Sequence, residues 1–134
     1  MRRERVKFAA FDFTRGSDGS CRARVVLVRG AGQDFVGEAE GSGSPTGELR
    51  CAAVATAAAL ENAVEGALRF ELLGVKAVRA FDATVVIVSL SCHNGGPAVR
   101  LVGSCLRETD LPRGASLAVL NATNRVLGNA IFVR

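Results

Sequence analysis

The sequence FVGEAEGSGSP at residues 35–45 leads into an alanine-rich run that ends at Gly66. The sequence LVGSCLRETDLP at residues 101–112 leads in the same way into a second run, which ends at Gly128. Each stretch has the pattern of a strand, a polar turn with a proline, a helix and a terminal glycine. We therefore interpret the chain as two copies of one unit.

Three strands are expected in front of each helix, because short alternating or continuous apolar runs are separated by glycine-rich or polar turns. The six predicted strands cover residues 6–15, 21–29, 34–40, 70–81, 83–92 and 98–107. The run Val25–Val28 matches Val85–Val88 in this comparison. The order βββα-βββα predicts an α+β fold in which antiparallel strands carry the helices on one face and two repeats pack about a pseudo-twofold axis.

The predicted boundaries divide one domain, residues 1–134, into a repeat at 6–66, a repeat at 70–128 and a short tail at 129–134. Ser44 suits the N-cap of the first helix and Pro45 its first position. Thr109 or Asp110 is expected to cap the second helix. The predicted buried stripes are Leu49, Ala53, Thr56, Leu60 and Ala63 in the first helix, and Leu111, Ala115, Ala118, Ala122 and Val126 in the second.

The composition favours self-association. Of the 134 residues, 49% are hydrophobic and the mean hydropathy is +0.24, a high value for a soluble monomer. Leu117, Leu120 and Leu127 lie off the predicted stripe of the second helix, so that helix is apolar on more than one side. We therefore expect a subunit interface and a homodimer or higher homo-oligomer. No apolar run has the length of a membrane helix or of a signal-peptide core, so a cytoplasmic location without membrane contact is expected.

Catalytic and metal-binding patterns are missing from the sequence. The four cysteines, Cys21, Cys51, Cys92 and Cys105, form no C-x-x-C pair, and we interpret them as buried free thiols. His93 is the single histidine, and its neighbour Cys92 points to the opposite face of a strand. No nucleophile–base pair can be assembled from these residues, so we expect a protein that is not an enzyme and that uses no metal and no cofactor.

The second repeat resembles a known family along its last strand and helix. Val102-Gly103, Thr109-Asp110-Leu111, Ala115-Ser116, Leu120-Asn121-Ala122 and Asn124-Arg125 resemble the C-terminal regulatory domain of α-isopropylmalate and citramalate synthases. The resemblance covers residues 6 to 128 and implies a standalone regulatory domain, since 134 residues cannot hold a catalytic barrel.

The resemblance also implies that the domain dimerises and binds an end-product amino acid or a related small carboxylate. The positions that match the ligand-binding turns are Gly41, Ser42, Gly43, Ser44 and Pro45 before the first helix, and Thr109, Asp110 and Leu111 before the second. Free N–H groups at a helix N-terminus attract an anion, and glycines allow close approach.

Two alternative functions are left open by the residues. The same sheets and helices could serve a purely structural assembly protein. The net charge of +4, with Arg22, Arg24 and Arg29 on one predicted strand, also admits a nucleic-acid-binding module. The scattered placement of most charges and the absence of Trp and Tyr argue against the latter.

Overall fold

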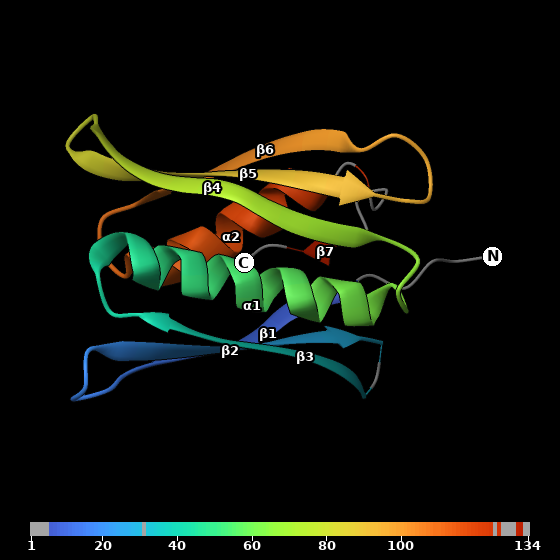
Figure 1. The fold of residues 1–134 in the computed structure, drawn as a ribbon, viewed down its shortest axis with the longest axis horizontal. Helices are drawn as coiled ribbons and strands as arrows, with labels where there is room; N and C mark the ends of the chain where they lie inside the picture. Colours follow the sequence, from blue (N-terminus) through green and yellow to red (C-terminus); the bar gives the residue numbers. More distant parts are fainter. Residues whose placement is uncertain (1–5, 31, 125, 127–130, 133–134) are drawn as a thin grey trace.

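A computed structural model describes residues 6–30, 32–124, 126 and 131–132 (Figure 1). Its elements are β1 (Val6–Arg15), β2 (Ser20–Arg29), β3 (Gln33–Ser42), α1 (Pro45–Ala63), β4 (Arg69–Ala80), β5 (Ala83–His93), β6 (Val99–Arg107), α2 (Leu111–Asn124) and β7 (Ile131–Phe132). The six predicted long strands and two predicted helices are all present, with ends that move by no more than a few residues. The exception is the end of the second helix, which the sequence placed near Gly128, a position outside the described residues.

The strands form two separate sheets. The first has the order β3-β2-β1-β7, and the second has the order β4-β5-β6. Neighbours within β1–β3 and within β4–β6 are antiparallel, whereas β7 pairs with β1 in the parallel direction, with Ile131 opposite Val6. The predicted α+β fold of two βββα units is therefore confirmed.

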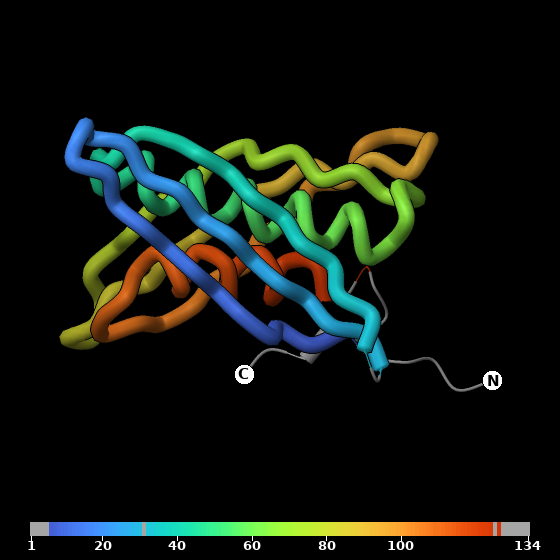
Figure 2. The backbone as a smooth tube through the Cα atoms, turned by 90° about the horizontal axis from the view of Figure 1, so that it is seen from below, coloured from blue at the N-terminus to red at the C-terminus, as the bar shows by residue number. Residues whose placement is uncertain are grey.

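Both helices lie between the two sheets, so each sheet carries helices on one face only (Figure 1). Figure 2, viewed from the side of the first sheet, shows the two helices beside each other behind strands β1–β3. This arrangement explains why α1 is so rich in alanine: Ala52, Ala53, Ala55 and Ala59 have no exposed surface, and small side chains let neighbouring elements approach closely.

Gly37 in β3 and Gly103 in β6 lie directly against helix backbone. A Cβ atom on Gly37 would overlap backbone atoms of Ala55 and Ala59 in α1. A Cβ atom on Gly103 would overlap backbone atoms of Ala118 and Ala122 in α2 in the same way. The two βββα units therefore use one packing device twice.

The strand pairing of these two glycines shows that the predicted alignment of the two repeats was wrong. Val25 pairs with Gly37 across β2 and β3, and Val88 pairs with Gly103 across β5 and β6. Val25 is thus equivalent to Val88, whereas the sequence comparison had matched it with Val85. The reason is that a run of four apolar residues carries no mark of which residues face inward; Val25 and Val88 are fully buried and Val85 is only half-buried.

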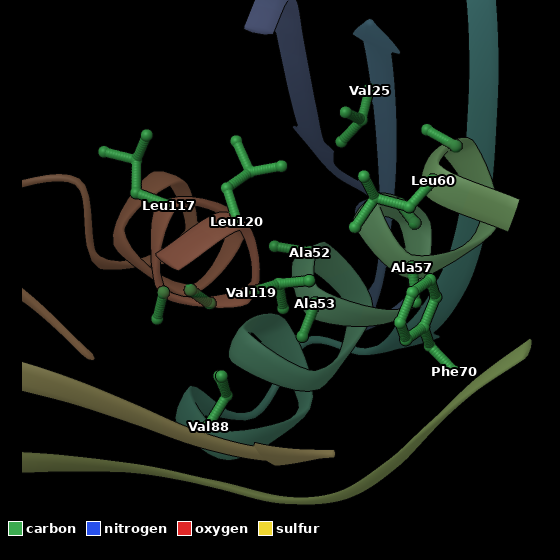
Figure 3. Close-up of a cluster of buried hydrophobic side chains, with 14 of the residues drawn as sticks. Val25, Ala52, Ala53, Ala57, Leu60, Phe70, Val88, Leu117, Val119 and Leu120 are labelled. Atoms are coloured by element: carbon green, nitrogen blue, oxygen red, sulfur yellow. The ribbon is translucent and has the colours of Figure 1, made fainter. Parts of the chain in front are cut away.

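Because α2 lies between the two sheets (Figure 1), its second apolar side is buried within the same chain. Leu117 and Leu120 are buried at 7% and 0% exposure within this chain. Figure 3 shows both side chains on the side of α2 that faces the first sheet, with Val88 of the second sheet on the other side. Their apolar character is therefore accounted for without a second subunit. Val126, predicted as part of the stripe, lies beyond the end of α2 and is exposed, while Leu127 lies outside the described residues.

The helix ends largely follow the predicted capping. Ser44 accepts a hydrogen bond from the N–H of Gly47 and is the N-cap of α1. Of the two candidates in the second repeat it is Asp110 whose side chain accepts a bond from a first-turn amide, that of Arg113. At the C-terminus of α1, Gly66 N–H bonds to the carbonyl of Glu61 and Glu65 N–H to that of Asn62. This is a Schellman motif in which Glu65 occupies the left-handed position, with φ 55.

Candidate functional site

The turns that precede the two helices meet at one end of the molecule. They line a pocket of about 600 Å³ that is open to solvent. Its lining residues are Arg15, Gly43, Pro45, Thr46, Glu48, Leu49, Val75, Lys76, Ala77, Asp110, Leu111 and Pro112. Residues that are far apart in the sequence, from both βββα units, thus form one concave surface.

Half of the predicted site residues belong to this pocket. Gly43, Pro45, Asp110 and Leu111 line it. The other four predicted residues, Gly41, Ser42, Ser44 and Thr109, are not among its lining residues.

Those four residues have structural contacts instead. Gly41 faces the core near the side chain of Cys51. The hydroxyl of Ser42 accepts a hydrogen bond from the N–H of Ser44, whose own hydroxyl caps α1. The carbonyl of Thr109 accepts a bond from Arg107 Nε at 3.3 Å. These residues shape the two turns.

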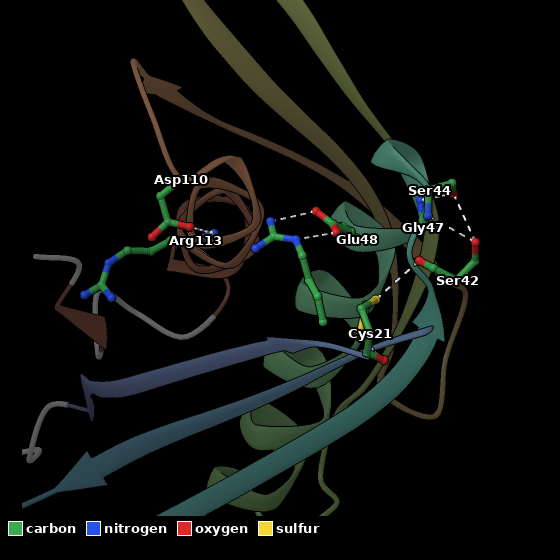
Figure 4. A network of polar contacts seen from close by, with 9 residues as sticks. Cys21, Ser42, Ser44, Gly47, Glu48, Asp110 and Arg113 are labelled. Carbon is green, nitrogen blue, oxygen red and sulfur yellow. Dashed lines mark hydrogen bonds and ion pairs between the residues drawn. The ribbon is translucent and has the colours of Figure 1, made fainter. Parts of the chain in front are cut away.

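Arg15 and Glu48 form an ion pair at the pocket, which the two dashed lines that end on Glu48 mark in Figure 4. Arg15 Nε and Nη2 donate to the two carboxylate oxygens of Glu48 at 2.6 and 2.9 Å, a bidentate geometry. The hydrogen bond to Glu48 and the charge of that carboxylate raise the pKa of Arg15 above its ordinary value. The side chain of Glu48 is 15% exposed, while that of Arg15 is 62% exposed and accessible from the pocket.

Arg15 was not predicted as a site residue. It is the last residue of β1, separated by 33 positions from Glu48, and the sequence offers no sign that the end of this strand lies beside the start of α1. Glu48 lies in the first turn of α1, where the helix dipole also favours an anion.

The pocket combines both signs of charge with an apolar wall. Arg15 and Lys76 are cations, Glu48 and Asp110 are anions, and all four line it. The apolar wall comes from Leu49, Val75, Ala77, Leu111 and Pro112. Such a surface is chemically suited to a small ligand that carries a carboxylate, an ammonium group or both beside a hydrocarbon part.

The cysteines have the environment of unreactive thiols. Cys21, Cys51 and Cys92 are buried and Cys105 is half-buried, and all four are free. Desolvation by burial and a hydrogen bond that the Cys51 thiol donates to Cys21 raise the pKa of Cys51 to about 12. Burial also raises the pKa of Cys92 and of Cys105, in the latter against the lowering effect of Arg107. A thiolate nucleophile is disfavoured by such surroundings.

His93 ends β5, where its side chain is half-exposed and its Nε2 lies 3.6 Å from Glu71. Within the described part of the chain, no three His, Cys, Asp or Glu side chains are grouped so that they could hold a metal ion. No helix of the described residues is long and apolar enough to cross a membrane.

The three arginines of β2 have acidic or carbonyl neighbours. Arg22 forms an ion pair with Glu40. Arg24 lies opposite Asp12 on β1 and Glu38 on β3. Arg29 donates to the carbonyl of Ala63 and stacks over the ring of Phe35 at 5.2 Å. These contacts reduce the positive potential that a phosphate backbone needs.

No family model matches the sequence, and no curated protein matches it. The resemblance to the synthase regulatory domain therefore stays a prediction that rests on the residues quoted for it. The function has to be inferred from the pocket and from the surfaces that the fold leaves exposed.

Proposed function

We propose that this chain is a non-catalytic, dimer-forming α+β module that binds a small carboxylate or an amino acid in the pocket between the N-termini of α1 and α2. The observation that carries the proposal is that the turns before both helices line one pocket. An amino acid matches the pocket by chemistry. Its carboxylate suits Arg15 and the helix N-termini, its ammonium group suits Asp110, and an apolar side chain suits Leu49 and Leu111.

The size of the pocket agrees with this ligand class. Small-molecule pockets typically span about 300–1,000 Å³, with mostly apolar linings and a few charged groups that fix orientation. The volume of about 600 Å³ lies within that range. Dimerisation, the second half of the proposal, is supported by the exposed apolar residues of the second sheet, described below.

A thermal-shift screen followed by calorimetric titration tests the ligand half. The probes are leucine, isoleucine, valine, their 2-oxo acids and small dicarboxylates. A ligand that binds only the folded state raises Tm in proportion to the logarithm of its concentration, and at about 100 times its Kd it adds about 2.7 kcal/mol to the stability.

Two matched variants make the test specific. Arg15→Gln removes the pocket cation that pairs with Glu48 and leaves Lys76 in place. We expect it to weaken binding at least about tenfold, as is typical for the loss of a charge-assisted hydrogen bond. Arg24→Gln makes the same change on the outer face of the first sheet, away from the pocket lining, and should bind like the wild type. Equal binding by both variants would place the ligand elsewhere.

A purely structural assembly protein is the second candidate function, favoured by the apolar outer face of the second sheet. Val102 and Leu106 are 63% and 60% exposed on that face. A dimer whose Tm is unchanged by every probe would support this candidate over the ligand-binding one.

A further inference from the structure

The outer face of the second sheet, which turns away from both helices, carries several exposed apolar side chains. Strand pairing aligns its residues in rows across β4, β5 and β6: Val78, Val85 and Leu106; Lys76, Ile87 and Ser104; Gly74, Ser89 and Val102; Glu71, Ser91 and Arg100. Val78 is 38% exposed, and Val102 and Leu106 are more so. Leu73, at the register shift of β4, adds a further exposed apolar side chain.

The outer face of the first sheet has the opposite character. Its rows across β1, β2 and β3 include Thr14, Arg22 and Glu40, then Asp12, Arg24 and Glu38. Arginine in the central strand lies between acidic or polar neighbours there, a pattern that suits water. Among the described residues, β4 and β6 therefore carry large exposed apolar side chains, Leu73, Val78, Val102 and Leu106, whereas β1–β3 carry none. Apolar patches that persist on one of two equivalent surfaces mark an interaction site.

We propose that the outer face of β4-β5-β6 is the interface with a second copy of this chain, packed sheet to sheet about a twofold axis parallel to β5. In that geometry β4 of one copy lies over β6 of the other. Val78 then meets Leu106 of the second copy, and Ser89 and Ser91 of the two central strands let the sheets approach.

Charge complementarity favours a second copy of this chain as the partner and a twofold axis parallel to β5. Glu71 and Arg100 share one row, on opposite edges of the sheet with Ser91 between them. Two strand spacings of about 4.8 Å separate them within one chain, where Glu71 lies 3.6 Å from His93 Nε2 and forms no ion pair with Arg100. The twofold axis brings Glu71 over Arg100 of the second copy and, by symmetry, Arg100 over its Glu71. Each chain thus supplies both halves of two ion pairs at the rim of an apolar centre.

The turn that joins β4 to β5 extends the apolar surface at its end. Phe81 is 94% exposed, and Phe81 and Asp82 have φ values of 54 and 60 in a two-residue hairpin turn. Turns of this kind prefer Asn-Gly, and a bulky residue at positive φ is an outlier. A fully exposed phenylalanine in a strained turn beside an apolar sheet face is consistent with a contact that forms only in the dimer.

This inference rests on the dimerisation in the proposed function and is independent of its ligand. Sedimentation velocity and multi-angle light scattering over a concentration series measure the dissociation constant of the full chain. We expect Leu106→Glu to raise it at least about 100-fold, because a charge is placed against Val78 of the second copy, and twice by symmetry. Val54→Glu is the matched control, since Val54 is 41% exposed but lies on α1. It should dimerise like the wild type.

Charge reversal tests the axis. Glu71→Arg or Arg100→Glu alone should raise the dissociation constant about tenfold, because each creates two like-charge contacts. The double variant should return to within about threefold of the wild type, since both pairs form again with reversed sign. Circular dichroism of every variant checks the fold.

Each contrary result has a distinct meaning. A wild type that stays monomeric overturns the inference together with the dimerisation in the proposed function. A wild-type dimer that Leu106→Glu leaves intact shows that the interface lies elsewhere, and the proposed dimerisation stands. Single reversals without rescue in the double variant overturn the twofold geometry. Ligand titration of the same variants judges the pocket separately.

Discussion

The hydroxyl oxygens of Thr56 in α1 and Ser116 in α2 lie 2.8 Å apart, and neither residue has exposed surface. Both oxygens also lie near the carbonyl of Ala52, at 2.8 Å from Thr56 and 3.3 Å from Ser116. This cluster is a buried polar contact between the two βββα units in a mostly apolar middle layer. It satisfies both buried hydroxyls, which would otherwise be costly to desolvate.

A double-mutant cycle measures how much this contact stabilises the fold. We expect Thr56→Val and Ser116→Ala each to lower the free energy of unfolding by about 1 kcal/mol, because each leaves its partner with the Ala52 carbonyl as an alternative. The double variant should cost less than the sum of the two, by about 0.5 kcal/mol or more. Urea denaturation followed by circular dichroism gives the values.

Thr123 provides the control cycle. It is fully buried, but its hydroxyl donates only within α2, towards Val119 and Leu120. Combining Thr123→Val with Thr56→Val should therefore give additive effects. If the effects of Thr56→Val and Ser116→Ala were also additive, the contact between the two hydroxyl groups would contribute nothing to the free energy of unfolding.

Gly37 and Gly103 lead to a second stability prediction. Alanine at either position places a methyl group against helix backbone, which cannot move without shifting the whole helix. We expect each substitution to lower the free energy of unfolding by about 3 kcal/mol or more, at the upper end of the range for overpacking. Similar losses at both sites are expected because the packing device is the same in both units.

The control for these variants is Gly96→Ala, made in the loop between β5 and β6. Its added Cβ would meet only Asn94 Oδ1, at an ordinary 3.6 Å. A change within about 0.5 kcal/mol of the wild type is expected, as for surface substitutions. If Gly37→Ala were as mild as Gly96→Ala, the close approach of α1 to β3 would be wrong.

The order and type of the elements could be predicted from the sequence because they depend on local chemistry. Alternation identified β1, and serine followed by proline identified the start of α1. The layer arrangement could not be predicted, because apolar residues on two sides of a helix fit a second subunit as well as a second sheet. Leu117 and Leu120 were therefore assigned to an interface with a second subunit. In the structure they are covered by the other βββα unit of the same chain (Figure 3).

The candidate site could be predicted only in part from the sequence. The turns before the helices were identified from glycine, proline and capping residues, and Gly43 and Asp110 do line one pocket. Arg15 was missed because its contact with Glu48 depends on how β1 crosses the start of α1, a tertiary relationship without a local signal. The break between the strands at Asp82 was predicted, but Phe81 was assigned to the strand and not to the turn, because a phenylalanine is not typical of a turn position with positive φ.

The raised pKa of Cys51 predicts a loss of stability in alkaline solution. The folded thiol has a pKa of about 12, whereas its unfolded counterpart titrates near the ordinary value of 9.0. The folded state therefore holds the proton more tightly. This contribution is fully present below the unfolded pKa and is lost as the pH rises towards the folded one.

Urea unfolding of the wild type and of Cys51→Ala, from about pH 7 to about pH 10.5, tests this prediction. The wild type should lose stability faster than the variant above about pH 9, and the slope is the measure because the substitution also removes a little packing at every pH. The chain contains no tyrosine, so no phenol titrates in this range. Parallel profiles would show that the Cys51 thiol ionises equally easily in both states.

Glu65 gives the last prediction, because it occupies the left-handed position of the Schellman motif that ends α1, at φ 55. Residues with a Cβ are disfavoured there by about 1–2 kcal/mol, and glycine loses part of that gain through its greater freedom in the unfolded chain. Glu65→Gly should therefore raise the free energy of unfolding by about 0.5–1 kcal/mol. Glu65→Ala removes the same carboxylate but keeps the Cβ, so it should not stabilise the protein. Equal effects of the two substitutions in thermal unfolding would assign the change to the lost charge and contradict a strained helix end.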